Sequence, residues 1–221
     1  MGGTMWTLPP DAERLPSSGE GPEELWRRSH PLAGSDAEAY FAKRRVPLGV
    51  AEAADVRFTE DLEGRPAVLA RLAGPSGDLH AVHGRYLHNR RGEGKMLTAG
   101  RPGGVFGGGG RDADLLVLVE GLFDALSLAT AGLPAVATIG RWVDWLPAGR
   151  GGRDVWLAFD GNRPGERWAA EWAKALRGGR VFRLRPPGGR GDWNSAARRI
   201  GAEDLERWIR RDAARYLEVM G

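Results

Sequence analysis

The sequence contains no cysteine among its 221 residues. It therefore forms no disulfide and no zinc site with thiolate ligands. The four histidines show no metal-ligand spacing joined to an acidic partner. We therefore expect any bound metal ion to be a hard cation that is held by oxygen ligands.

Long hydrophobic runs are also missing. No stretch approaches the roughly 18 apolar residues that are needed to cross a bilayer, and the first residues lack the basic and then apolar plan of a signal peptide. We therefore expect a cytoplasmic protein without a membrane partner. The formal net charge is only +3, which by itself is weak evidence for a nucleic-acid partner.

The sequence does contain apolar segments that end abruptly in an acid. The runs 115–119 and 155–159 are followed by Glu120-Gly121 and Asp160-Gly161, and a third acid, Asp192, comes after the apolar run 181–184. Such runs are typical of buried parallel strands, and ligands bind at the carboxyl edge of parallel sheets. The three acids are therefore expected to converge on one edge and to form a divalent metal site.

The pattern of the chain changes near residue 113. We expect a flexible leader over 1–21, a smaller α+β subdomain over 22–112, an α/β domain over 113–200 and a C-terminal helix over 201–221. The Gly-rich segment 107–110 is expected to be a linker. In the first part we expect helices over 23–30 and 37–45, the second capped by Ser35, and strands over 56–58, 67–72, 79–85, 96–97 and 105–106. In the second part we expect strands over 115–119, 135–138, 154–159 and 180–184, and helices over 122–131, 166–176, 193–200 and 202–219.

The order of the acidic motifs resembles that of the Toprim domain family. The segment from Val119 to Asp124 is similar to its glutamate motif, and the segment from Phe159 to Gly165 is similar to its aspartate motif. Gly191-Asp192-Trp193-Asn194 resembles the third motif of phage and mobile-element members. The resemblance implies a small, mostly parallel sheet that is flanked by helices.

The upstream segments resemble the amino-terminal subdomain of bacterial (DnaG-type) primase cores. They follow the same order as in that subdomain: the segment that begins at Pro66, then Gly84-Arg85-Tyr86, Gly94-Lys95-Met96 and Val105-Phe106. The entry to the subdomain is similar to that of plasmid and phage primase-like proteins. The expected fold is therefore α/β, with a Toprim domain preceded by a smaller α+β primase-like subdomain.

The resemblance implies Mg²⁺ or Mn²⁺ as cofactor. It makes Glu120, Asp160 and Asp192 the expected catalytic residues, with Glu120 acting as metal ligand or as general base. The expected metal ligands are Glu120, Asp124, Asp160, Asn162, Asp192 and Asn194, and Asp124 has capping of a helix as its alternative role. Asparagine stands at 162 and 194 where the family usually has acids, so we expect weaker metal binding than usual.

A basic, glycine-rich stretch runs from Ala81 to Arg111. Arg85 and Lys95 match basic positions along the template path of primase cores, and Arg90, Arg91 and Arg101 are further candidates for binding nucleic acid. A solvated, arginine-rich loop is the alternative interpretation of this stretch. Among the nine tryptophans, we expect Trp142, Trp145 and Trp193 to face nucleotides, and Trp26, Trp156, Trp168 and Trp172 to lie in the core.

The leading functional hypothesis is a primase-like nucleotidyltransferase core that binds a single-stranded DNA template and nucleotides. No cysteine-based zinc module and no P-loop helicase motif occur in the sequence, so a separate helicase or zinc-binding template-recognition protein is an expected partner. A Toprim nuclease that cleaves phosphodiester bonds is one alternative. A non-catalytic nucleic-acid-binding module of a phage or plasmid is the other.

Overall fold

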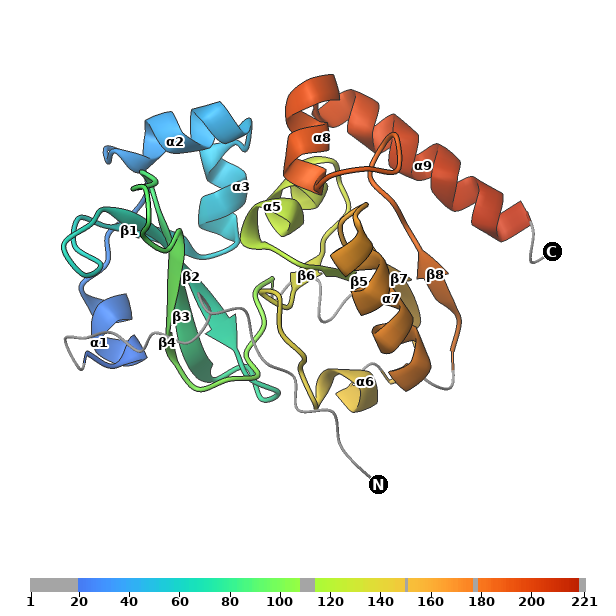
Figure 1. Ribbon diagram of the computed structural model, residues 1–221, viewed down its shortest axis with the longest axis horizontal. Helices are drawn as coiled ribbons and strands as arrows, with labels where there is room; N and C mark the ends of the chain where they lie inside the picture. The colour runs from blue at the N-terminus through green and yellow to red at the C-terminus, as the bar shows by residue number, and fades with distance from the viewer. Residues whose placement is uncertain (1–19, 108–113, 150, 177–178, 219–221) are drawn as a thin grey trace.

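The computed structural model describes residues 20–107, 114–149, 151–176 and 179–218, with side chains up to residue 212. Nearly all of the expected leader over 1–21 lies outside these residues, as do positions 108–110 of the expected linker and Arg111. The described chain contains two sheets that lie side by side, each with its own helices (Figure 1). No described helix has the length and apolar character needed to cross a bilayer.

The first sheet is antiparallel and follows three short helices. The helices are α1 (Pro22–Arg27), α2 (Ala37–Arg44) and α3 (Leu48–Ala53), and the strands are β1 (Val56–Thr59), β2 (Ala67–Ala73), β3 (Leu79–Tyr86) and β4 (Met96–Gly100). The strands pair in the order β1-β2-β3-β4. Side chains along a strand alternate between the two faces of the sheet. Accordingly, Val68 and Ala70 pack toward α2 and α3, whereas Leu69 packs on the opposite face with Leu25 of α1.

The second sheet is entirely parallel. Its strands are β5 (Leu115–Val119), β6 (Val136–Ala137), β7 (Asp154–Leu157) and β8 (Val181–Arg183), in the order β6-β5-β7-β8. The helices are α5 (Leu122–Thr130), α6 (Leu146–Gly149), α7 (Arg163–Ala175), α8 (Trp193–Ile200) and α9 (Ala202–Glu218). Leu116 and Leu118 of β5 pack on the face that α7 covers, and Val117 and Val119 pack on the face with α5 and α8. This doubly covered sheet explains why the sequence of β5 is apolar throughout.

The two sheets share one hydrophobic core. Phe41 of α2 and Val68 of β2 belong to the same buried cluster as Val119 of β5 and Trp193 of α8. The main chain also joins the sheets, because Val105 bridges to Ala73 of β2 and the next residue bridges to Ala137 of β6. The shared core fixes the first sheet against the carboxyl edge of the second, which is where the acids lie.

The architecture that we expected is confirmed: a parallel α/β sheet flanked by helices, preceded by an α+β subdomain. Some local predictions differ from the structure. Helix α3 was not expected, because Pro47 was interpreted only as a helix stop, whereas it also serves as the N-cap of α3. The N-cap of α2 is Asp36 rather than Ser35. Residues 105–106 form two isolated bridges rather than a strand.

Candidate functional site

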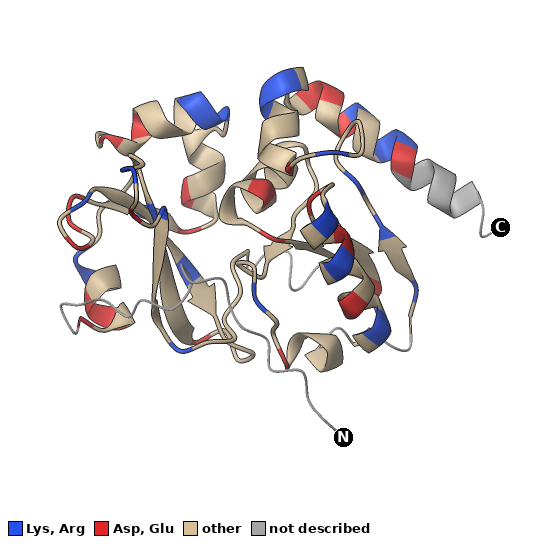
Figure 2. Cartoon of the chain, in the orientation of Figure 1, with Lys and Arg blue, Asp and Glu red and all other residues tan. Residues whose placement is uncertain are grey.

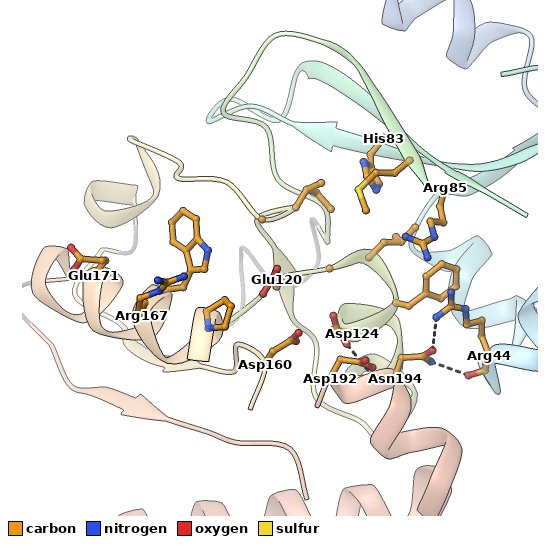
Figure 3. A pocket seen from close by; sticks show the side chains of 18 of the residues that line it. Arg44, His83, Arg85, Glu120, Asp124, Asp160, Arg167, Glu171, Asp192 and Asn194 are labelled. Atoms are coloured by element: carbon orange, nitrogen blue, oxygen red, sulfur yellow. Dashed lines mark hydrogen bonds between the residues drawn. The ribbon is translucent and has the colours of Figure 1, made fainter. Parts of the chain in front are cut away.

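Two of the expected catalytic acids lie at the carboxyl ends of neighbouring strands. Glu120 follows β5 directly, and Asp160 follows β7, which pairs with β5 in parallel through Leu118 and Leu157. Both side chains line one pocket of about 960 Å³ between the two sheets. Figure 3 shows Glu120, Asp124, Asp160 and Asp192 gathered on one wall of this pocket.

Glycines allow the Asp160 loop to lie close to its neighbours. The amide of Gly161 donates to the carbonyl of Gly191 at 2.8 Å, which joins the loop to the segment that carries Asp192. A Cβ atom at Gly161 would lie 2.6 Å from the carbonyl oxygen of Gly189, and a Cβ at Gly165 would collide with the main chain of Asp160. Only glycine fits such approaches of one backbone to another.

Arg183 of β8 holds the main chain that carries Asp160. Its guanidinium donates to the carbonyl oxygens of Leu157 at 2.9 Å, Phe159 at 2.8 Å and Asp160 at 2.7 Å. The same group donates to the carboxylate of Glu166 in the first turn of α7 at 2.9 Å. A planar guanidinium can satisfy several acceptors at once, so Arg183 fixes the main chain that carries Asp160.

Asp192 and Asp124 organise the start of α8. Asp192 is the N-cap, and its carboxylate accepts the amide of Ser195 at 2.6 Å. Asp124 is only 8% exposed, and its Oδ1 atom accepts the amides of Trp193 at 3.0 Å and Asn194 at 3.2 Å. The alternative role of Asp124 thus has a clear geometry, in which it caps α8 rather than its own helix.

The acids of this wall have raised pKa values. Burial raises the pKa of Asp160 to about 7, with additional repulsion from Glu120 and Asp192, while its hydrogen bond from Asn162 and the charge of Arg183 oppose the shift. Burial, followed by Asp160 and Asp192, raises the pKa of Asp124 to about 8. Burial and then Asp192 also raise the pKa of Glu120. The protein by itself therefore stabilises the charged forms of these carboxyl groups poorly.

The two asparagines occupy different environments. Asn162 is exposed and caps α7, because its Oδ1 accepts the amide of Gly165 at 2.8 Å, while its Nδ2 donates to Asp160 at 3.2 Å. The cap explains why α7 begins at Arg163, three residues before the predicted start. Asn194 is buried and directed away from the acids. Its amide nitrogen donates to the carbonyl of Arg44 at 2.9 Å and to Ser127 Oγ at 3.0 Å, and its oxygen accepts from the Arg44 guanidinium at 3.1 Å.

Arginines and apolar side chains form the rest of the pocket. Arg44 of α2 and Arg85 of β3 face the acids from the first sheet and its helices (Figure 3). The guanidinium of Arg44 lies 4.6 Å from the ring centroid of Phe123, and the Nε atom of Arg85 is buried without a hydrogen-bond partner. His83, beside Arg85, has its pKa lowered to about 3 by burial and then by nearby arginines. Phe123, Ile139, Met96 and Trp168 add an apolar surface to the pocket.

The other candidate nucleic-acid contacts lie outside this pocket. Arg91 and Lys95 are exposed. Arg90 lies 3.9 Å from Glu93, and Arg101 forms an ion pair with Asp78 at 3.0 Å. Arg85 is thus the one member of this group that the structure brings to the acids among the residues it describes.

The expectation for the tryptophans is partly wrong. Trp193 is fully buried and donates to the carbonyl of Ala158 at 2.6 Å, so it cannot stack on a nucleotide. The ring centroids of Trp142 and Trp172 lie 4.3 Å apart with the planes tilted by 34°, and Trp145 packs against the hydrophobic cluster that contains Trp172. Trp168, which we expected in the core, is partly buried against this cluster and also lines the pocket.

The sequence did not reveal the roles of three residues: two line the pocket, and the third holds the main chain at Asp160. Arg44 lies four residues after Tyr40, within a helix that we predicted, but no local pattern shows that it reaches the acids. Trp168 is four residues before Trp172 on α7, and their shared face predicts packing for both. Arg183 lies within a short strand of partly buried side chains, where nothing in the sequence marks a buried guanidinium.

No group of three histidine, aspartate or glutamate side chains is arranged to hold a metal ion among the residues that the structure describes. The donor set nevertheless suits a hard cation, since it consists of carboxylates gathered on one wall of the pocket. Mg²⁺ keeps several of its waters and is usually bound by one or two carboxylates together with substrate phosphates. Glu120, Asp160 and Asp192 are therefore a chemically suitable set for a partly hydrated ion.

Comparison with known families decides the identity of the second sheet and its helices. The sequence of residues 115–203 matches the family described as Toprim domain. This part of the chain is a Toprim domain. Residues 18–109 match a family described as a domain of unknown function (DUF7146). No curated protein matches the sequence of the chain.

Solved structures show that the whole fold is that of primase catalytic cores. The primase of Aquifex aeolicus, with its zinc-binding and RNA polymerase domains, is 18% identical with a TM-score of 0.64, covering 86% of this chain and 59% of that one. A DNA primase domain from Pseudomonas aeruginosa is 20% identical with a TM-score of 0.64, covering 84% and 75%. A DnaG primase catalytic domain bound to ssDNA is 18% identical with a TM-score of 0.64, covering 86% and 77%. The chain thus has a Toprim domain within a primase-like fold and spans about three fifths of the Aquifex chain.

Proposed function

We propose that the chain is a primase-like nucleotidyltransferase core, which binds single-stranded nucleic acid and joins nucleotides with the help of Mg²⁺ or Mn²⁺. The observation that carries this proposal is the pocket itself, which sets Glu120, Asp160 and Asp192 against Arg44 and Arg85. A nucleotide brings both a phosphate for the arginines and, with its bound cation, a counter-charge for the acids. The primase-like fold supports the same reaction class.

Asp160 and Asp192 are the residues that would hold the metal ion, with Glu120 as a third ligand or as the base. When bound, the ion would stabilise negative charge on the attacking and leaving oxygens. In the reaction, a 3′-hydroxyl oxygen forms a bond to the α-phosphorus of a nucleoside triphosphate, and pyrophosphate leaves. In its role as base, Glu120 accepts the hydroxyl proton.

The chain's other residues bind and orient the substrate. Arg85 offers a buried Nε–H that has no partner within the described protein, and a phosphate oxygen would satisfy it. Arg44 is already oriented by Asn194 and Tyr40, so little side-chain entropy is lost when it binds. Trp168 and Ile139 offer apolar surface against which a nucleobase can pack.

A primer-synthesis assay on single-stranded DNA, with each metal and with both ribonucleotides and deoxyribonucleotides, tests the proposal. We expect incorporation by the parent chain and a loss of at least about 100-fold in Glu120→Gln, because charge stabilisation and proton transfer both depend on this carboxylate. Glu206→Gln on α9 is the matched control and should retain activity. Full activity of Glu120→Gln would overturn the assignment, and shortening of the labelled strand would instead indicate a nuclease.

A second candidate is a non-catalytic nucleic-acid-binding module. It is favoured by the two asparagines, since Asn194 is wholly engaged in hydrogen bonds with α2 and α5 and cannot replace the usual acid. Calorimetry separates the two candidates. Undetectable Mn²⁺ binding together with salt-dependent binding of single strands would favour the module.

Template recognition and unwinding would be supplied by partners. The Aquifex aeolicus primase structure contains a zinc-binding domain beside its RNA polymerase domain, and this chain has no cysteine with which to build a thiolate zinc site. We therefore retain a zinc-binding template-recognition protein and a helicase as proposed partners. Reconstitution of primer synthesis with candidate proteins would test this.

A further inference from the structure

A second, smaller pocket of about 310 Å³ lies next to the candidate site. It runs along α2 and is closed by the segment after β3 and by α8. The residues that line it are Asp36, Ala39, Tyr40, Lys43, Arg44, Leu87, His88 and Arg198. Arg44 lines both pockets, so the two pockets adjoin at this side chain.

The cations of this second pocket are not neutralised by the protein. Lys43, Arg44 and Arg198 form no ion pair with any carboxylate that the structure describes, whereas Arg90, Arg101 and many other arginines do. Arg44 is held instead by uncharged groups, namely the amide of Asn194 and the hydroxyl of Tyr40. The lining contains one acid, Asp36, at the far end of α2.

The arrangement brings together cations from separate parts of the chain. Lys43 and Arg44 lie in the last turn of α2, and Arg198 lies in the last turn of α8. In Figure 2 the basic end of α2 faces the basic end of α8. A cation near a helix C-terminus interacts favourably with the helix dipole, and this accounts for the position of each basic residue taken alone. It does not explain why the basic ends of two helices line one pocket.

We propose that this second pocket binds the phosphodiester backbone of a single-stranded nucleic acid as the strand leaves the acidic site. The inference rests on the proposed function, because the strand must first lie in the neighbouring pocket. Unpaired Lys and Arg side chains along a groove are the chemistry that neutralises consecutive phosphates. A strand is favoured over a free nucleotide because the second pocket adjoins the acidic one at Arg44 and adds two further cations, Lys43 and Arg198.

Salt-dependent binding of a labelled 20-nucleotide oligo(dT) to the full chain tests the proposal. The double variant Lys43→Ala/Arg198→Ala removes two expected phosphate contacts and should lower the slope of log K against log salt by about 1.4. Its affinity at low salt should fall about tenfold. The control Arg27→Ala/Arg210→Ala removes the same charge from arginines that are paired with Glu24 and Glu206, and its slope should remain close to that of the parent.

Two further measurements sharpen the test. Asp36→Asn should tighten binding about twofold to threefold, because it removes the one acid of the pocket and its side chain makes no capping hydrogen bond. A free nucleoside triphosphate, which has no phosphodiester chain to extend into the second pocket, should bind the parent and the Lys43→Ala/Arg198→Ala variant equally well. Thermal melting confirms that each variant is folded.

The outcomes separate this inference from the proposed function. If the parent binds the oligonucleotide and Lys43→Ala/Arg198→Ala has the same slope as the control, the second pocket does not bind the strand. If the double variant loses competition by free GTP while its binding of the strand is unchanged, the pocket binds a free triphosphate and the inference is overturned. If the parent binds no single strand at all, the proposed function fails as well.

Discussion

The two walls of the main pocket are built in different ways. Each acid of one wall stands where a strand or its following loop ends and a helix begins, so the backbone of the parallel sheet sets its position. The arginines of the other wall come from α2 and β3, and their long side chains reach the pocket through tertiary packing. The comparison shows that the acidic wall is determined by local topology and the basic wall by the docking of the two sheets.

The walls also differ in how the protein balances their charge. Burial, and then the neighbouring acids, raise the pKa values of Asp124 and Asp160, and Arg183 is a nearby cation that lowers the pKa of Asp160. Arg44 and Arg85 form no ion pair with a carboxylate among the described residues. Because each wall lacks its counter-charge, the pocket is complementary to a phosphate that arrives with a divalent cation.

Asn194→Asp would break the connection between the walls and is expected to have the largest effect on stability. An aspartate cannot donate to the carbonyl of Arg44 or to Ser127 Oγ, and it adds a buried charge near Asp124. We expect the free energy of unfolding to fall by about 2–4 kcal/mol. Denaturant unfolding measures this, and a variant as stable as the parent would show that the hydrogen bonds from Asn194 do not hold α2 against the Toprim domain.

Arg183→Lys would loosen the acidic wall alone. Lysine keeps the charge but cannot donate to several carbonyls in one plane, so we expect a loss of about 2 kcal/mol in unfolding free energy. The rate of nucleotide joining should also fall, because the main chain that carries Asp160 loses its hydrogen bonds from Arg183. Arg185→Lys, which pairs with the same Glu166 from an exposed position, is the control and should change stability by less than about 0.5 kcal/mol. Equal effects of the two variants would contradict the positioning role of Arg183.

The comparison of the two walls also explains how far the sequence could predict the site. Strand β5 and helix α8 match their predicted ranges, because an apolar run and an Asp N-cap are local signals. The meeting of Glu120 with Asp160 follows from strand order and was predicted. The hydrogen bond between Asn194 and Arg44 could not be predicted, because the two residues are 150 positions apart in the chain. Likewise, no periodicity shows that Trp168 lines a pocket while Trp172, on the same helix, is fully buried.

His83 provides a pH test of the basic wall. The folded-state pKa of His83, about 3, lies below its ordinary value, so its contribution to stability is complete above about pH 6.5 and is lost as the pH falls toward 3. The loss should approach about 1.4 kcal/mol per pH unit well below pH 6.5. His83→Gln should remove this part of the pH dependence, whereas His88→Gln, at an exposed position, should leave it in place. Unfolding curves from pH 7 to 4 measure the difference, and a parent and His83→Gln with the same pH dependence would show that His83 is not buried in its neutral form.

Asn162→Asp would sharpen the acidic wall at the smallest expected cost in stability. Aspartate is as good an N-cap as asparagine, so it can still accept the amide of Gly165, and the unfolding free energy should change by less than about 0.5 kcal/mol. The substitution replaces a donor to Asp160 with a second carboxylate at an exposed position.

We expect Asn162→Asp to bind Mn²⁺ several-fold more tightly by calorimetry, since the added carboxylate supplies charge where the amide supplies none. Asn162→Ser is the matched control, because it keeps a capping oxygen without adding charge, and it should not tighten binding. If both variants bind Mn²⁺ like the parent, position 162 serves only to cap α7, and Asp160 would have to hold the ion without its help.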